Sequence, residues 1–343
     1  MKNRVIFLLC LLLAVVSLSA QQKFNVQNGT KAEFYDDLET AIQKAVSGDT
    51  IYLPGYPVQV QNDLIIDKKL AIIGAGCDVD SVGGLLTTEI KKANGDATVN
   101  FLNGSDGSLL TGCIVGNVQF GNRDEFNVAQ QNISNVTLWR NKITGFLYLG
   151  IDPATNQVKQ IIISENNFTY NNTPDGRNAS DCIINNNLFV FGISGLVNSH
   201  LYNNVTRSGN ITALTNCIVE NNFFATGTVT NCTNSTFNNN AFTTDFTFPV
   251  GTNLGSNNLM SQETIRTFTV NDLSLPKNLK VRDDSACKNA GTDGRDIGIF
   301  GGANPYKDGA VPFNPHINSA AVSSQIDKDG NLNVSIQVSA QTR

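Results

Sequence analysis

Charged and aromatic residues suited to binding or cleaving a sugar chain gather in the central part of this sequence. Carboxylates accept hydrogen bonds from hydroxyl groups or act as general acid and base, and an indole ring can cover the apolar face of a sugar. We expect these residues to line a carbohydrate-binding groove. Solvated loops are the alternative for the charged residues, and core packing is the alternative for the tryptophan. The candidates are Arg123, Asp124, Glu125, Trp139, Asp152, Asp175 and Arg177.

The candidates lie in or beside the longest units of an internal repeat. An Asn pair returns after each short apolar run, and the first members of five pairs are separated by 17, 18, 18 and 18 residues. Recurrence at about 20 residues is typical of a stacked repeat fold. Earlier units are longer, and insertions at similar places in stacked units rise side by side on one flank. The long units therefore predict the groove.

The repeat predicts an all-β fold, namely a right-handed parallel β-helix of about ten coils. Apolar and polar columns alternate beside the Asn pairs, as strands with one buried face require. Asn tolerates the left-handed backbone region, and stacked Asn side chains can form hydrogen bonds along the axis. The competing left-handed β-helix has a strict six-residue period, which units of 24, 25, 20 and 17 residues break. The expected structural ladder is Asn141, Asn166, Asn186, Asn203, Asn221, Asn239 and Asn257.

Two further segments are suited to closing the ends of the stack. Residues 34–46 predict an amphipathic helix with Phe34, Leu38 and Ile42 on one face, and residues 50–55 predict the start of a strand. Residues 289–302 predict the final coil and its cap. Together with the Asn ladder, these segments resemble right-handed parallel β-helix proteins of the pectate-lyase-like superfamily, of exported bacterial type. The resemblance covers roughly residues 30–305 and matches no single enzyme family.

The resemblance implies a role with glycans. Lyases of this superfamily use a basic residue, often with calcium held by carboxylates, and glycosidases on this fold use clustered Asp carboxylates. Arg140 and Lys142 flank a turn without a clearly aligned carboxylate, and the central coils contain no Asp pair. We therefore expect a carbohydrate-binding protein without a catalytic set or cofactor. The alternatives are a lyase or hydrolase acting on a uronate-containing glycan, with calcium only for a lyase, and a structural or adhesive surface protein.

The ends of the chain predict export and an appended hairpin. Residues 1–20 have the basic start, apolar centre and small-residue exit of a signal peptide, with cleavage near Ala20. Residues 21–305 then form the β-helix with its cap, and residues 306–343 form a linker and a β-hairpin around an Asp-Gly turn. We expect a secreted, periplasmic or cell-surface protein without membrane insertion. Its oligomeric state stays open.

Net charge limits the classes of partner, and the cysteine content bears on disulfides and metal sites. The formal net charge of −5 argues against nucleic acid and against an anionic membrane as partner. The partner that we expect is a polysaccharide or surface glycan. Six cysteines follow the leader, and we expect Cys113, Cys182 and Cys217 to open the same repeat register. We expect buried free thiols and not disulfides, and no metal site, because the sequence has no Cys-x-x-Cys pair and only two isolated His residues.

Overall fold

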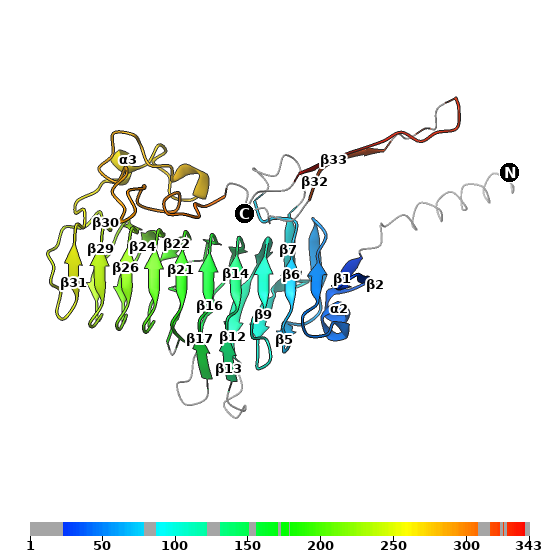
Figure 1. The fold of residues 1–343 in the computed structure, drawn as a ribbon, viewed down its shortest axis with the longest axis horizontal. Coiled ribbons are helices and arrows are strands. Elements are labelled where there is room, and N and C mark those ends of the chain that lie inside the picture. Colours follow the sequence, from blue (N-terminus) through cyan, green and yellow to red (C-terminus); the bar gives the residue numbers. More distant parts are fainter. Residues whose placement is uncertain are drawn as a thin grey trace.

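The computed structural model describes residues 23–78, 87–121, 131–150, 156–170, 173–177, 179–307, 316–322, 325 and 328–339. These residues form a parallel β-helix, in which the chain winds through about nine turns (Figure 1). The predicted fold class is confirmed, with one turn fewer than the expected ten. Strands of successive turns pair in parallel, so each sheet runs along the axis of the stack.

Sheet A is the longest sheet, and its strands follow the order β2-β1-β3-β6-β10-β14-β18-β21-β23-β26-β29-β31. From β3 onwards its strands are parallel, whereas β1 and β2 form an antiparallel hairpin at its end. The strands are β1 (Phe24–Asn28), β2 (Lys31–Tyr35), β3 (Thr50–Tyr52), β6 (Ala71–Ile73), β10 (Leu109–Thr111), β14 (Thr137–Trp139), β18 (Ile162–Ser164), β21 (Ile183–Asn185), β23 (His200–Tyr202), β26 (Ile218–Glu220), β29 (Thr236–Asn238) and β31 (Leu254–Ser256).

Sheet B follows sheet A along the chain, in most turns after a tight corner. Its strands are β4 (Pro57–Val60), β7 (Thr88–Lys92), β8 (Gly95–Asp96), β11 (Cys113–Val115), β15 (Lys142–Ile143), β19 (Asn167–Phe168), β22 (Leu188–Phe191), β24 (Val205–Ser208), β27 (Phe223–Phe224) and β30 (Ala241–Phe242).

Two further strand positions occur in some of the turns. Sheet C contains β5 (Leu64–Ile66), β9 (Thr98–Phe101), β12 (Asn117–Phe120) and β16 (Leu147–Tyr148), and its line continues in β25 (Ile211–Thr212) and β28 (Val229–Thr230). Sheet D contains β13 (Gln131–Ser134), β17 (Asn156–Lys159) and β20 (Ala179–Ser180), and leads back to sheet A.

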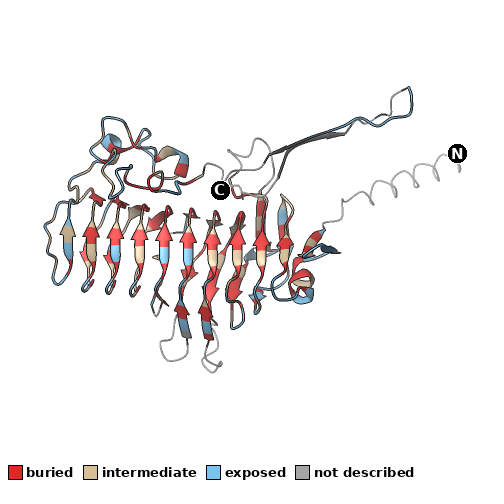
Figure 2. Ribbon diagram, viewed as in Figure 1, coloured by how far each residue is buried: buried red, intermediate tan, exposed pale blue. Residues whose placement is uncertain are grey.

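The core is a set of columns, one residue per turn, because side chains alternate between the two faces of a strand. The middle residues of the sheet A strands, such as Leu138, Ile163 and Val219, are fully buried. Aromatic rings also stack between successive turns, as in Phe168 on Phe189 with ring centroids 4.5 Å apart. Figure 2 shows this buried interior along the whole stack.

The open end of the first turn is covered by the β1–β2 hairpin and by α2 (Leu38–Lys44). The side chain of Asp37 caps this helix by accepting a hydrogen bond from the amide of Thr40. The expected capping helix is present but shorter than residues 34–46. Phe34 lies in the extended strand β2 and is 62% exposed, so its predicted place on the apolar helix face is wrong.

The prediction that residues 289–302 form the final coil is also wrong. The last strand of sheet A is β31, and the chain then turns back outside sheet B through α3 (Thr264–Thr267) and the 3-10 helix η2 (Pro276–Asn278) (Figure 1). Ile297 and Ile299 join a buried cluster with the outward-facing Val205 and Phe223 of sheet B. The apolar pattern that suggested a coil thus covers the outside of the stack.

The predicted C-terminal hairpin is confirmed. Strands β32 (His316–Val322) and β33 (Val334–Ser339) pair antiparallel, with Gly330 in the connection. In Figure 1 this hairpin projects away from the stack.

The six cysteines that follow residue 22 are all buried and free in the described chain, as predicted. Cys182 and Cys217 occupy one column at the corner between sheets D and A, where Ser199 and Ser235 supply hydroxyls to the amides of the preceding turn. The expectation that Cys113 shares their register is wrong. The amide of Cys113 donates to Asn141, which places this cysteine at the corner between sheets A and B.

Candidate functional site

The structure divides the predicted groove residues between different sheets. Arg123, Asp124, Glu125 and Asp152 lie outside the described residues. Asp175 pairs with Tyr148 and Ser194 along the line of sheet C, and its carboxylate binds the guanidinium of Arg177 at 2.6 Å and raises the pKa of that group. Trp139 ends strand β14 of sheet A. Because sheets A and C form different faces of the coil, Trp139 does not share a groove with Asp175 and Arg177.

An Asn ladder follows the corner between sheets A and B. The side-chain amide of each ladder Asn donates to the carboxamide oxygen of the next, for example Asn204 to Asn222 at 2.9 Å. Asn141 and Asn166 belong to this ladder as predicted, but in later turns the ladder uses the residue that follows the predicted one. The ladder consists of Asn141, Asn166, Asn187, Asn204, Asn222, Asn240 and Asn258.

The predicted ladder residues Asn186, Asn203, Asn221, Asn239 and Asn257 instead form a column just before the ladder. Each has a left-handed backbone with φ between 51° and 59°, a conformation that Asn tolerates well. Four of their side chains bind residues 287–307, which we call the strap. Asn186 donates to the carbonyls of Ile299 and Gly301, Asn203 to Gly298, Asn221 to Thr292, and Asn239 to Ala290.

Two of the turns that have a ladder Asn carry a charged residue in this left-handed column. Arg140 and Glu165 both have φ of 54°, and they form an ion pair with 3.0 Å between Nε and Oε2. Each side chain is only 4% exposed. Neither residue type favours the left-handed region, and burying two charges costs solvation free energy. Since Asn fills the same position in later turns, the fold does not require this pair.

The ion pair forms one wall of a cavity of about 400 Å³, which we call the Trp139 pocket. Strands β14 and β18 provide the floor with Thr137, Trp139, Ile162 and Ser164. Residues 303–305 and Lys307 of the strap provide the opposite wall. The volume falls within the usual range of small-molecule sites.

The carboxylate of Glu165 holds this pocket together. Its Oε1 accepts a hydrogen bond from the indole N–H of Trp139 at 2.9 Å, and its Oε2 accepts from the main-chain N–H of Lys307 at 3.0 Å as well as from Arg140. The guanidinium carbon of Arg140 lies 4.3 Å from the centre of the Trp139 ring. The indole is therefore fixed by a hydrogen bond and a cation–π contact. The three N–H donors fix the position of the carboxylate.

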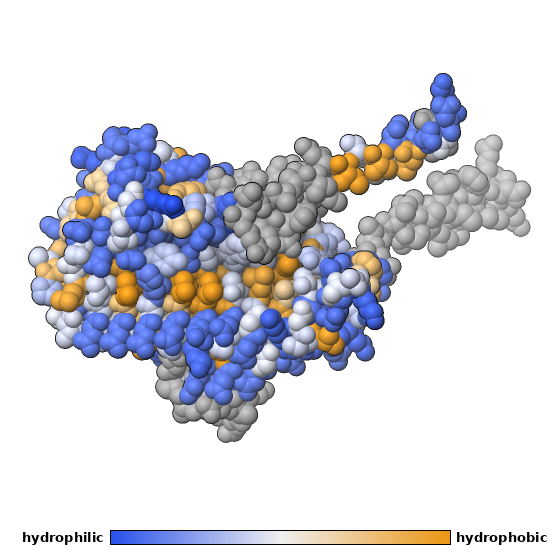
Figure 3. Space-filling view, viewed as in Figure 1, coloured by the Kyte–Doolittle hydropathy of each residue, from blue (hydrophilic) through white to orange (hydrophobic). Residues whose placement is uncertain are grey.

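The outer face of sheet A continues from this pocket along the stack. Its first outward column contains Ile183, His200, Ile218 and Leu254, and its second contains Tyr202 and Glu220. The His200 and Tyr202 rings lie 4.5 Å apart, and Nε2 of His200 lies 2.9 Å from the Glu220 carboxylate. Burial, with a smaller effect of the Glu220 charge, raises the pKa of Tyr202. Figure 3 shows a broken row of apolar patches along this face of the stack.

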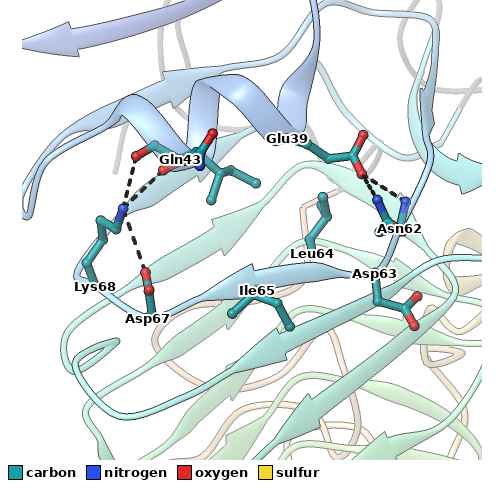
Figure 4. Close-up of a pocket in the computed structure, with 9 residues that line it drawn as sticks. Glu39, Gln43, Asn62, Asp63, Leu64, Ile65, Asp67 and Lys68 are labelled. Atoms are coloured by element: carbon teal, nitrogen blue, oxygen red, sulfur yellow. Dashed lines mark hydrogen bonds and ion pairs between the residues drawn. The ribbon is translucent and has the colours of Figure 1, made fainter.

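A second cavity, of about 300 Å³, lies between α2 and β5 (Figure 4). Its polar groups hold the capping helix in place. The carboxylate of Glu39 accepts hydrogen bonds from the amides of Gln61 and Asn62, and the ammonium of Lys68 donates to carbonyls at the end of the helix. These contacts explain the cavity as part of the cap.

Sequence patterns missed Glu165 and Lys307 as site residues and treated Arg140 only as a turn neighbour. A usable signal was present, because the position before the ladder Asn is Arg or Glu in two turns and Asn in the later ones. In the residues that the structure describes, no cluster of three metal-binding side chains was found. The described helices are also too short or too polar to cross a membrane. A comparison with models of protein families found no match, and a search of curated proteins found none.

Proposed function

We propose that this is an exported protein that binds carbohydrate in the Trp139 pocket, without cleaving it. The observation that carries the proposal is the indole of Trp139, fixed at the floor of a cavity of suitable volume by Glu165 and Arg140. An immobilised indole stacks on a sugar ring at little cost in side-chain entropy. The leader-like residues 1–20 and the resemblance to exported pectate-lyase-like proteins support the same role.

A binding role fits the pocket better than hydrolysis or elimination. Hydrolysis of a glycosidic bond uses two carboxyl groups, one of which changes protonation. Glu165 is the one carboxylate among the described lining residues, and its two oxygens already accept hydrogen bonds from three N–H donors. Arg140, the nearest candidate base, is paired with that carboxylate.

The test uses the chain from Gln21 onwards in affinity gel electrophoresis with neutral and uronate polysaccharides, with and without calcium. We expect one class of polysaccharide to retard the protein, without new reducing ends or unsaturated products. Trp139→Ala should abolish the retardation. Tyr170→Ala is the matched control, because it removes an exposed aromatic ring that packs near Phe146, outside the pocket. Product formation would establish an enzyme, and absence of retardation by every polysaccharide would overturn the proposal.

A further inference from the structure

The outer face of sheet A carries an exposed apolar column that the stack itself does not use. Ile183, Ile218 and Leu254 occupy equivalent positions in β21, β26 and β31, and their exposed fractions are 39%, 49% and 63%. They continue the line of Ile162, which lies on the floor of the Trp139 pocket. His200 lies between Ile183 and Ile218, and Thr236 lies between Ile218 and Leu254, so the apolar column is interrupted twice. Exposed apolar surface with a polar rim commonly marks a binding site.

Hydrogen-bonding side chains line both edges of this column. On one edge, the corner between sheets D and A presents exposed amides from Asn198, Asn216 and Asn234, each in the left-handed conformation. On the other edge, Tyr202, Glu220 and Asn238 form the second outward column beside the strap. The hydrophilic row that borders the apolar row is visible in Figure 3.

The charged residues on this face indicate which class of ligand it can bind. The outward positions of β21 to β31 contain Ile, Asn, His, Tyr, Glu, Thr, Leu and Ser, and neither Lys nor Arg. Glu220 is held by His200. A polyanion would meet no cation on these strands to replace its water and counterions. The face suits a ligand with an apolar strip, hydroxyl groups on both edges and no charge.

We infer that this face binds an extended, unbranched, neutral glycan that runs along the stack from the Trp139 pocket; this inference rests on the proposed function. Sugar rings would place their C–H faces on the apolar column and their hydroxyls against the two polar edges. From β14 to β31 there are six strand spacings, which at roughly 4.8 Å each span about 29 Å. A chain of several sugars therefore fits, and affinity should grow with its length.

The experiment measures the affinity of short and long neutral oligosaccharides by isothermal titration calorimetry. The probes are unbranched β-linked glucose, mannose and xylose oligomers, with a polyuronate oligomer for comparison. Ile218→Ser and Asn216→Gly should each weaken binding of long oligomers roughly threefold to tenfold and leave disaccharide binding unchanged. Trp139→Ala should weaken binding of both. Glycine is chosen for Asn216 because it keeps the left-handed backbone and removes only the amide.

Two matched variants control for nonspecific effects. Ile65→Ser changes an exposed Ile on β5 of sheet C, and Asn231→Gly changes an exposed left-handed Asn at a different corner. Both should bind long oligomers like the parent protein.

The outcomes separate this inference from the proposed function. Equal affinity for disaccharides and long oligomers would overturn the extended site and leave a single sugar in the Trp139 pocket. Tighter binding of the polyuronate than of the neutral oligomers would overturn only the inference that the glycan is uncharged. Loss of a dimer in Ile218→Ser, seen by light scattering, would show that a second copy covers the face and would overturn the inference. Failure of every glycan to bind would overturn both proposals.

Discussion

The carboxylate of Glu165 accepts a hydrogen bond from the main-chain N–H of Lys307 at 3.0 Å, across 142 positions of sequence. This bond closes the Trp139 pocket, since Lys307 stands on the strap and Glu165 on the corner after β18. It occupies the place that Asn186, Asn203 and Asn239 fill in later turns, where amide groups hold the strap carbonyls. At Glu165 the stack thus presents a carboxylate to the strap, where those turns present side-chain amides.

The first prediction concerns this buried pair. Glu165→Asn should lower the free energy of unfolding by about 3–5 kcal/mol, because it removes the carboxylate that compensates the buried guanidinium of Arg140. The double variant Arg140→Asn, Glu165→Asn should recover most of that loss, since it extends the Asn column to both turns. Urea unfolding of the parent, both single variants and the double variant gives the coupling energy. Additive losses in the double variant would show that the pair does not act as a unit.

The second prediction distinguishes the ladder from the column beside it. Asn222→Leu should destabilise the protein by roughly 3 kcal/mol or more, because it leaves the carbonyl of Leu201, the Asn204 amide and the Asn240 carboxamide without their buried partner. Asn221→Gly keeps the left-handed backbone and loses two hydrogen bonds with Thr292, one to its hydroxyl and one from its amide, so we expect roughly 1–2 kcal/mol. Thermal unfolding of both variants shows which one loses more stability. A larger loss for Asn221→Gly would contradict the assigned register.

The third prediction concerns docking of the strap. A Cβ at Gly301 would overlap the carbonyl oxygen of Asp296 and the side-chain amide of Asn203. Gly301→Ala should therefore loosen the strap, and limited proteolysis should cut within residues 287–307 much sooner than in the parent. Gly294→Asn is the control, because its site is open and Asn tolerates the left-handed backbone found there. Equal cleavage rates in Gly301→Ala and the parent would show that the strap absorbs the overlap.

The fourth prediction is a pH dependence. Burial raises the pKa of the Cys182 thiol from its ordinary 9.0 to about 11. The unfolded chain therefore releases this proton at a lower pH than the folded chain. The contribution of the thiol to the free energy of unfolding is fully present below pH 9 and is lost as pH rises towards 11, at about 1.4 kcal/mol per pKa unit. Cys182→Ser should lose less stability between about pH 8 and about pH 10 than the parent. Serine suits this column, which already contains Ser199 and Ser235. Parallel losses in both proteins would assign the alkaline effect to other groups.

The sequence by itself determined the stacked architecture. The 18-residue recurrence of Asn pairs specifies one turn of the coil, because a tight corner needs a residue that accepts the left-handed backbone. The alternation of Val334, Ser335 and Ile336 after an Asp-Gly turn was enough for the terminal hairpin. Burial of the six cysteines also followed, since small apolar residues suit the interior columns.

Only the tertiary structure decided which Asn of each pair is the ladder and which holds the strap. Both members of a pair are Asn and lie at the same corner. Local backbone preference therefore cannot distinguish the amide that faces the interior from the amide that faces the strap. The pocket depends on the return of residues 287–307 along the stack, which brings Lys307 to Glu165. The repeat pattern of the sequence does not reveal such a long-range contact. The strap is held by the packing of Ile297 and Ile299 on the outside of sheet B, and these residues are not part of the repeat.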